Sequence, residues 1–180
     1  MDSQNGNSEK IPLRLAFGCQ ARVGKSTAVS YLVENYGGVE RSFAGNVYRI
    51  LHYAQDVCQF ERGKDREFLQ FVGTWARNKD VNTWIKSALR DIDLESDNNV
   101  YFSDVRFPNE FDALRKKGYI MVRIIRNSSK EIFGNKGDSS HESETSLLSK
   151  PLEDWDYVIE NNGSIEDFYH KLDQFISIII

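Results

Sequence analysis

The chain has 180 residues, and its net charge of −4 with a pI near 5.5 excludes a basic surface over the whole protein. We therefore expect no nucleic-acid partner. Only two cysteines are present, which excludes a disulfide framework and favours a reducing, cytoplasmic setting. Apolar runs such as the one at residues 178–180 are far too short to span a bilayer, so we expect no membrane partner.

The spacing of apolar residues predicts strands and helices that alternate along the chain. Polar residues 1–10 predict a disordered N-terminus, and strands are expected at residues 11–17, 39–43, 98–105, 119–125 and 156–160. Helices are expected at residues 28–36, 47–54, 69–76, 81–92, 107–118 and 165–179. This order predicts one α/β domain over residues 11–180, with about five mostly parallel strands and helices on both faces.

The segment GCQARVGKST, at residues 18–27, lies between the first strand and the first helix. A phosphate-binding loop curls backbone N–H groups around phosphate oxygens, while a lysine reaches the outer phosphates and a hydroxyl binds magnesium. GKST at residues 24–27 supplies the second half of such a loop. Gly18 comes one residue early, so Cys19 takes the usual glycine position. The alternative is an ordinary strand, turn and helix with a solvated lysine.

The segment SDVRFPNE, at residues 103–110, follows another apolar strand. Asp104 is therefore expected at the carboxyl end of the sheet, where ligands of open α/β sheets bind. Its carboxylate suits magnesium or a proton, and Arg106 offers a planar fork for a phosphate. The alternative is a surface Asp–Arg pair that caps the next helix.

Polar side chains also share one face of an expected middle helix. In REFLQFVGTWARN, at residues 66–78, four polar residues recur at three- and four-residue steps opposite the apolar ones: Arg66, Gln70, Thr74 and Arg77. This face suits an acceptor molecule, although a solvated polar face has the same pattern. Trp75 and Trp84 are assigned to the core, where helix aromatics usually lie.

Together, these segments resemble the deoxynucleoside monophosphate kinases of the P-loop kinase superfamily, which are best known from bacteriophages. The likeness covers nearly the whole chain after residue 10. It rests on ARVGKST, SFAGNVYRIL, REFLQFVGTWARN, FSDVRFPNEFDALRKKG, HESE and DYVIENNGSIEDF. DVRFPNE is the most specific of these segments, whereas DYVIENNGS is shared more widely among small-molecule P-loop kinases. The resemblance implies a three-layer P-loop kinase fold with a lid loop at residues 126–141.

The resemblance also implies the reaction, which is transfer of the γ-phosphoryl group of ATP to a deoxynucleoside monophosphate (dNMP), giving dNDP and ADP. Lys25, Asp104, Arg106 and Arg126 would be catalytic, and Ser26 with Asp104 would hold Mg²⁺. Arg126 would close onto the phosphates with the lid. The ATP-binding residues would be Ala21, Arg22, Val23, Gly24, Lys25, Ser26, Thr27 and Asn161, the last contacting adenine largely through its backbone.

The acceptor would bind at a helical region over residues 44–94. The residues implied there are Arg49, Arg66, Gln70, Thr74 and Arg77, joined by Arg106 from the sheet edge. Gln70 would bind the base, and an arginine would bind the phosphate. The order of preference among dNMPs stays open, and surplus aromatics on the middle helices are compatible with a homodimer.

Three alternatives remain at this point. One is a related kinase that phosphorylates dephospho-coenzyme A, and another is a kinase for a modified base in DNA, which the acidic composition disfavours. The third is a protein that senses ATP without transferring phosphate, although the acceptor arginines argue against it. A viral source would place the protein in the host cytoplasm.

Overall fold

The computed structural model describes residues 11–18, 20–90, 92, 98–127, 146–148 and 150–180. The expectation of a disordered N-terminus at residues 1–10 lies outside these ranges. So does the proposed lid, except for Arg126 and Asn127 at its start. The question of whether Cys19 contacts phosphate also falls outside the described residues.

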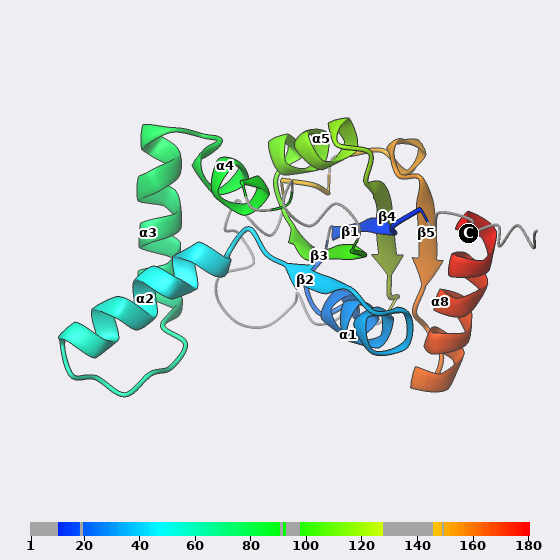
Figure 1. The fold of residues 1–180 in the computed structure, drawn as a ribbon, viewed down its shortest axis with the longest axis horizontal. Helices are drawn as coiled ribbons and strands as arrows, with labels where there is room; N and C mark the ends of the chain where they lie inside the picture. Colours follow the sequence, from blue (N-terminus) through cyan, green and yellow to red (C-terminus); the bar gives the residue numbers. More distant parts are fainter. Residues whose placement is uncertain (1–10, 19, 91, 93–97, 128–145, 149) are drawn as a thin grey trace, which may run out of the picture.

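Five parallel strands form one sheet in the order β2–β3–β1–β4–β5 (Figure 1). Their bounds are Arg14–Gly18 for β1, Val39–Arg41 for β2, Val100–Val105 for β3, Ile120–Ile125 for β4 and Tyr157–Glu160 for β5. The central strand β1 is apolar on both faces, and Leu15, Ala16 and Phe17 are fully buried. A continuous apolar run of this kind is typical of parallel strands covered on both sides. The predicted five-stranded parallel sheet is confirmed.

Helices cover the two faces of the sheet and give it three layers (Figure 1). α1 (Lys25–Tyr36) and α8 (Ile165–Ile179) pack on one face, where Leu15 and Phe17 of β1 meet Leu32 and Phe175. α4 (Thr83–Leu89) and α5 (Pro108–Lys116) pack on the other face, which contains Ala16 of β1. Alternate residues of one strand thus enter two different cores, as the period of two in a strand requires.

α2 (Gly45–Val57) and α3 (Arg66–Lys79) project beyond the β2 edge of the sheet (Figure 1). With α4 they form a helical lobe around a small core of Val47, Val72, Ala76 and Trp84. The Trp84 Nε1 donates to the Gly73 carbonyl at 3.1 Å, so Trp84 is a core residue as predicted. The core assignment of Trp75 is wrong, because its side chain is 54% exposed. A lobe with so small a core buries only one stripe of α3.

Because all five strands are parallel, their carboxyl ends lie side by side, and we call this side of the sheet its carboxyl edge. β1 ends at Gly18, β3 at Val105, β4 at Ile125 and β5 at Glu160. The segments that follow these strands are therefore neighbours, although they are far apart in the sequence. No helix in the described part of the chain has the length and apolar character needed to cross a membrane.

Candidate active site

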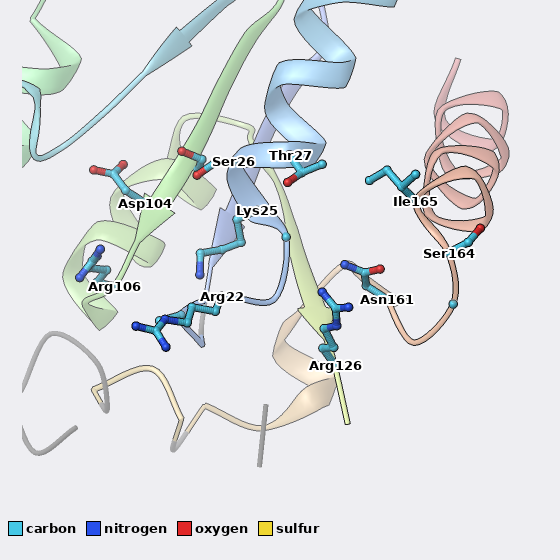
Figure 2. Close-up of a pocket in the computed structure, with 14 residues that line it drawn as sticks. Arg22, Lys25, Ser26, Thr27, Asp104, Arg106, Arg126, Asn161, Ser164 and Ile165 are labelled. Carbon is cyan, nitrogen blue, oxygen red and sulfur yellow. The ribbon is translucent and has the colours of Figure 1, made fainter. Parts of the chain in front are cut away.

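A cleft of about 560 Å³ opens at this edge of the sheet (Figure 2). It receives residues from the end of β3, from the segments after β1, β3, β4 and β5, and from the starts of α1 and α8. Ten of the sequence-predicted site residues line it: Ala21, Arg22, Gly24, Lys25, Ser26, Thr27, Asp104, Arg106, Arg126 and Asn161. Ser103, Gly163, Ser164 and Ile165 complete its wall. Val23 does not line the cleft, because its side chain is fully buried in the core beneath the loop.

The start of α1 has the backbone of a phosphate-binding loop. Gly24 precedes the helix with φ 108°, in the left-handed region that favours glycine. A Cβ at this position would also lie only 2.6 Å from Asn161 Nδ2. Gly24 has no side chain with which to cap the start of α1. The first N–H groups of the helix and its positive dipole end thus face the cleft, which is a favourable place for an anion.

The early glycine of the loop has a packing cause. At Gly18, a Cβ would lie 2.6 Å from Cη2 of the Trp155 ring and 3.2 Å from the Val105 carbonyl oxygen. Trp155 is buried and packs edge-on against Phe111 in the core under α5. Gly18 therefore serves the contact between β1 and this ring rather than a left-handed turn of the loop.

Four cationic side chains lie around the cleft (Figure 2). Lys25 is on the first turn of α1, and its Nζ donates to the Gln20 carbonyl across the loop. Arg22 belongs to the loop, whereas Arg106 and Arg126 follow β3 and β4. Cations that line a cleft beside a helix N-terminus suit the oxygens of a polyphosphate.

Asp104 lines the cleft and also holds the start of the helical lobe. Its Oδ2 accepts from the Ser42 hydroxyl at 2.7 Å and from the Ala44 N–H at 2.9 Å, and its Oδ1 accepts from the Phe43 N–H at 3.1 Å. These donors lie between β2 and α2. A carboxylate has about four acceptor positions, and these three bonds from described residues do not use all of them. The sequence analysis identified Asp104 but not this anchoring contact.

Glu110 fixes the backbone from which Arg106 projects. Its Oε2 accepts from the Arg106 N–H at 2.8 Å and from the Phe107 N–H at 3.0 Å. Burial raises the pKa of Glu110 to about 7; the charge of Asp104 adds to this, whereas the two N–H groups and Arg77 oppose it. Glu110 is a site-supporting residue that was not predicted from the sequence, although its place three residues after Phe107 is the spacing of a capping box. Glu110, rather than an Asp104–Arg106 pair, caps α5.

The other acceptor candidates lie on the helical lobe and do not line this cleft. Arg66, Gln70 and Thr74 are on α3, and Arg49 on α2 donates to Asn46 Oδ1 at 3.0 Å. The reason is that α2 and α3 project beyond the edge of the sheet. Arg77 reaches back, because its guanidinium lies 4.5 Å from the centre of the Phe107 ring, next to Arg106 in the chain.

Known proteins resemble this chain over most of its length. The family model for deoxynucleotide monophosphate kinases matches residues 64–172. A putative deoxynucleotide monophosphate kinase of Acanthamoeba polyphaga mimivirus is 30% identical over 178 residues, covering 83% of this chain and 88% of that protein. The deoxynucleotide monophosphate kinase of Enterobacteria phage T4 is 29% identical over 119 residues, and the match covers 63% of this chain and 46% of the phage protein.

The fold also has solved counterparts. A gluconokinase from Sinorhizobium meliloti superposes with a TM-score of 0.56 over 94% of both chains. At 14% identity, this likeness concerns the fold alone. The three-layer architecture is that of the P-loop kinases.

Proposed function

Because the chain belongs to the deoxynucleotide monophosphate kinase family, we propose that it transfers the γ-phosphoryl group of ATP to the 5′-phosphate of a deoxynucleoside monophosphate. The observation that carries this proposal is the cleft itself. The start of α1, Lys25, Arg106 and Arg126 all line this one cleft. Phosphoryl transfer depends on positioning and on positive charge, and this cleft supplies both.

On the donor side, the backbone N–H groups of residues 21–27 bind the phosphates of ATP. Lys25 stabilises the γ-phosphoryl group as it moves, and Arg126 adds positive charge from the end of β4. Ser26 and Asp104 are the residues that would hold Mg²⁺, which neutralises charge on the phosphate oxygens when bound. The described residues contain no cluster of three or more acidic, histidine or cysteine ligands. A site with few protein ligands fits magnesium, which is usually bound by one or two carboxylates and substrate phosphates.

On the acceptor side, Arg106 binds the 5′-phosphate of the dNMP. A phosphate monoester has its second pKa near 6, so its attacking oxygen is already ionised at neutral pH and needs no general base. That oxygen forms a bond to the γ-phosphorus, the bond from this phosphorus to its bridging oxygen breaks, and ADP leaves. Asp104 is therefore free to bind magnesium and to hold the lobe.

The rest of the acceptor is assigned to the helical lobe. We place its base near Gln70 and its phosphate between Arg106 and Arg77, which the Phe107 ring supports. The remaining residues proposed to contribute are Arg49, Arg66 and Thr74. Asp104 links the cleft to the start of the lobe through its bonds to residues 42–44.

The test is ADP production by the purified chain in a coupled assay, with ATP, Mg²⁺ and each of the four dNMPs or NMPs as acceptor. Lys25→Ala should lower turnover by about two to three orders of magnitude, while circular dichroism shows an unchanged fold. Lys116→Ala, which removes an exposed lysine at the end of α5, is the matched control and should keep full turnover. ATP binding without transfer to any acceptor would identify a sensor. ADP production in a further reaction with dephospho-coenzyme A, and with none of the nucleotides, would identify the related kinase.

A homodimer stays a prediction. Exposed apolar side chains on the helical lobe support it: Tyr53, Val57, Phe60, Phe71 and Trp75. Light scattering on the purified chain measures its mass directly, and a mass near 21 kDa at all concentrations would exclude the dimer.

A further inference from the structure

Asn161 is joined both to the sheet and to the phosphate-binding loop. It follows β5, and its N–H donates to the Ile125 carbonyl at 2.8 Å, which continues the pairing of β5 with β4. Its side-chain Nδ2 donates to the Val23 carbonyl at 2.8 Å, and the residue is buried at 7% exposure. Figure 2 shows the side chain pointing toward the loop that precedes Lys25. The loop is thus fixed to a rigid strand end 138 residues away in the chain.

This contact determines the direction of one peptide group. In a planar trans peptide, the C=O of one residue and the N–H of the next point in opposite directions. Since the Val23 carbonyl is directed at Asn161, the Gly24 N–H is directed away from Asn161. Gly24 lines the cleft, whereas Val23 lies beneath it. The contact thereby holds the Gly24 N–H in one direction, at a residue that lines the cleft.

We propose that Asn161 is a positioning residue, which fixes the Val23–Gly24 peptide so that the Gly24 N–H binds phosphate. It acts through the loop and does not need to touch the nucleotide, unlike the adenine contact that the family resemblance implied. The proposal rests on the proposed function, because it requires a nucleotide phosphate in the cleft. Without the amide, the buried Val23 carbonyl loses its partner. Rotation of the peptide toward the cleft would then place an oxygen, rather than an N–H, opposite the phosphate.

The experiment measures Mg-ADP binding by isothermal titration calorimetry, which requires no phosphoryl transfer. Asn161→Ala should weaken binding roughly tenfold, since one buried hydrogen bond is lost. Asn162→Ala is the matched control. Asn162 is the next residue in the chain, and its side-chain Oδ1 accepts from the Asn127 N–H, so the substitution removes one side-chain contact but leaves the contact to Val23 in place. It should bind Mg-ADP within twofold of the unaltered chain. Failure of the unaltered chain to bind Mg-ADP would refute the proposed function itself.

Asn161→Asp gives a readout that a merely structural role would not produce. At pH 8 the introduced carboxylate can only accept, so it opposes the Val23 carbonyl and should weaken binding more than alanine does. Burial raises the pKa of such a carboxyl, and once protonated it donates again. The affinity relative to the unaltered chain should therefore recover as the pH falls from 8 to 5.5.

Other charged groups near Asn161 do not change the ratio of affinities between a variant and the unaltered chain. Lys25 and Arg126 line the same cleft, and Lys171 donates to the Glu160 carbonyl at 2.7 Å beside it. All three are present in every variant, so their effects cancel in the ratio. A ratio for Asn161→Asp that stays flat with pH, or an Asn161→Ala chain that binds Mg-ADP as tightly as the unaltered chain, would overturn the proposal.

Discussion

Glu110→Gln should change how the stability of the protein depends on pH. Glu110 is buried at 6% exposure, and a single oxygen of its carboxyl group, Oε2, accepts from both the Arg106 and Phe107 N–H groups. A glutamine oxygen can accept the same two bonds without carrying a charge. The substitution therefore removes the ionisation of Glu110 and keeps its shape and contacts.

The magnitude follows from the pKa of Glu110, which folding raises from its ordinary value of 4.5 to about 7. The folded chain therefore keeps a proton that the unfolded chain releases, and this contribution to stability is full below pH 4.5 and is lost as the pH rises through 7. One pH unit corresponds to about 1.4 kcal/mol, so the contribution amounts to about 3 kcal/mol. We expect the variant and the unaltered chain to match at pH 4.5, and the variant to be more stable by up to about 3 kcal/mol at pH 8.

Urea denaturation at intervals from pH 4.5 to pH 8 measures this difference. Titrating groups elsewhere are common to both chains, so they cancel in the difference between the two unfolding free energies. Glu153→Gln, at an exposed glutamate, is the matched control for the loss of one carboxylate. A Glu110→Gln difference that is flat, or that favours the unaltered chain as the pH rises, would refute the reasoning. It would show that Arg77 and the two N–H groups outweigh burial.

Three further substitutions test contacts around the cleft. Gly18→Ala places a methyl group 2.6 Å from a carbon of the Trp155 indole and should lower the unfolding free energy by about 1–3 kcal/mol, as measured in thermal melts. In the control Gly63→Ala the methyl group meets no atom within 4 Å, so the unfolding free energy should not fall. Ser42→Ala removes the 2.7 Å bond to Asp104 and should raise the KM for dNMP about fivefold without changing that for ATP; a change in the ATP value alone would contradict it. Arg106→Lys should raise the KM for dNMP at least about tenfold, and the opposite pattern would move Arg106 to the donor side.

The sequence by itself predicted the architecture and much of the candidate site. Strands and helices are encoded by local spacing of apolar residues, so their order followed from periods of two and of about three and a half. The parallel sheet then followed from the alternation of strands with helices. GKST at residues 24–27 follows the loop after β1, and DVRFPNE at residues 104–110 begins in the last two residues of β3; parallel strands place their carboxyl ends together. Lys25, Asp104 and Arg106 were therefore predictable neighbours.

The tertiary structure decided which partner each side chain has. Asp104 holds residues 42–44, Asn161 holds Val23, and the Trp155 ring requires Gly18. These pairs are separated by 60 to 138 residues, and no local period records them. They depend on the order of the strands in the sheet and on the distances between elements. Glu110 was within local reach of its partners, but its raised pKa comes from burial. Burial is a property of the packed fold, because it depends on every element that excludes water from the group.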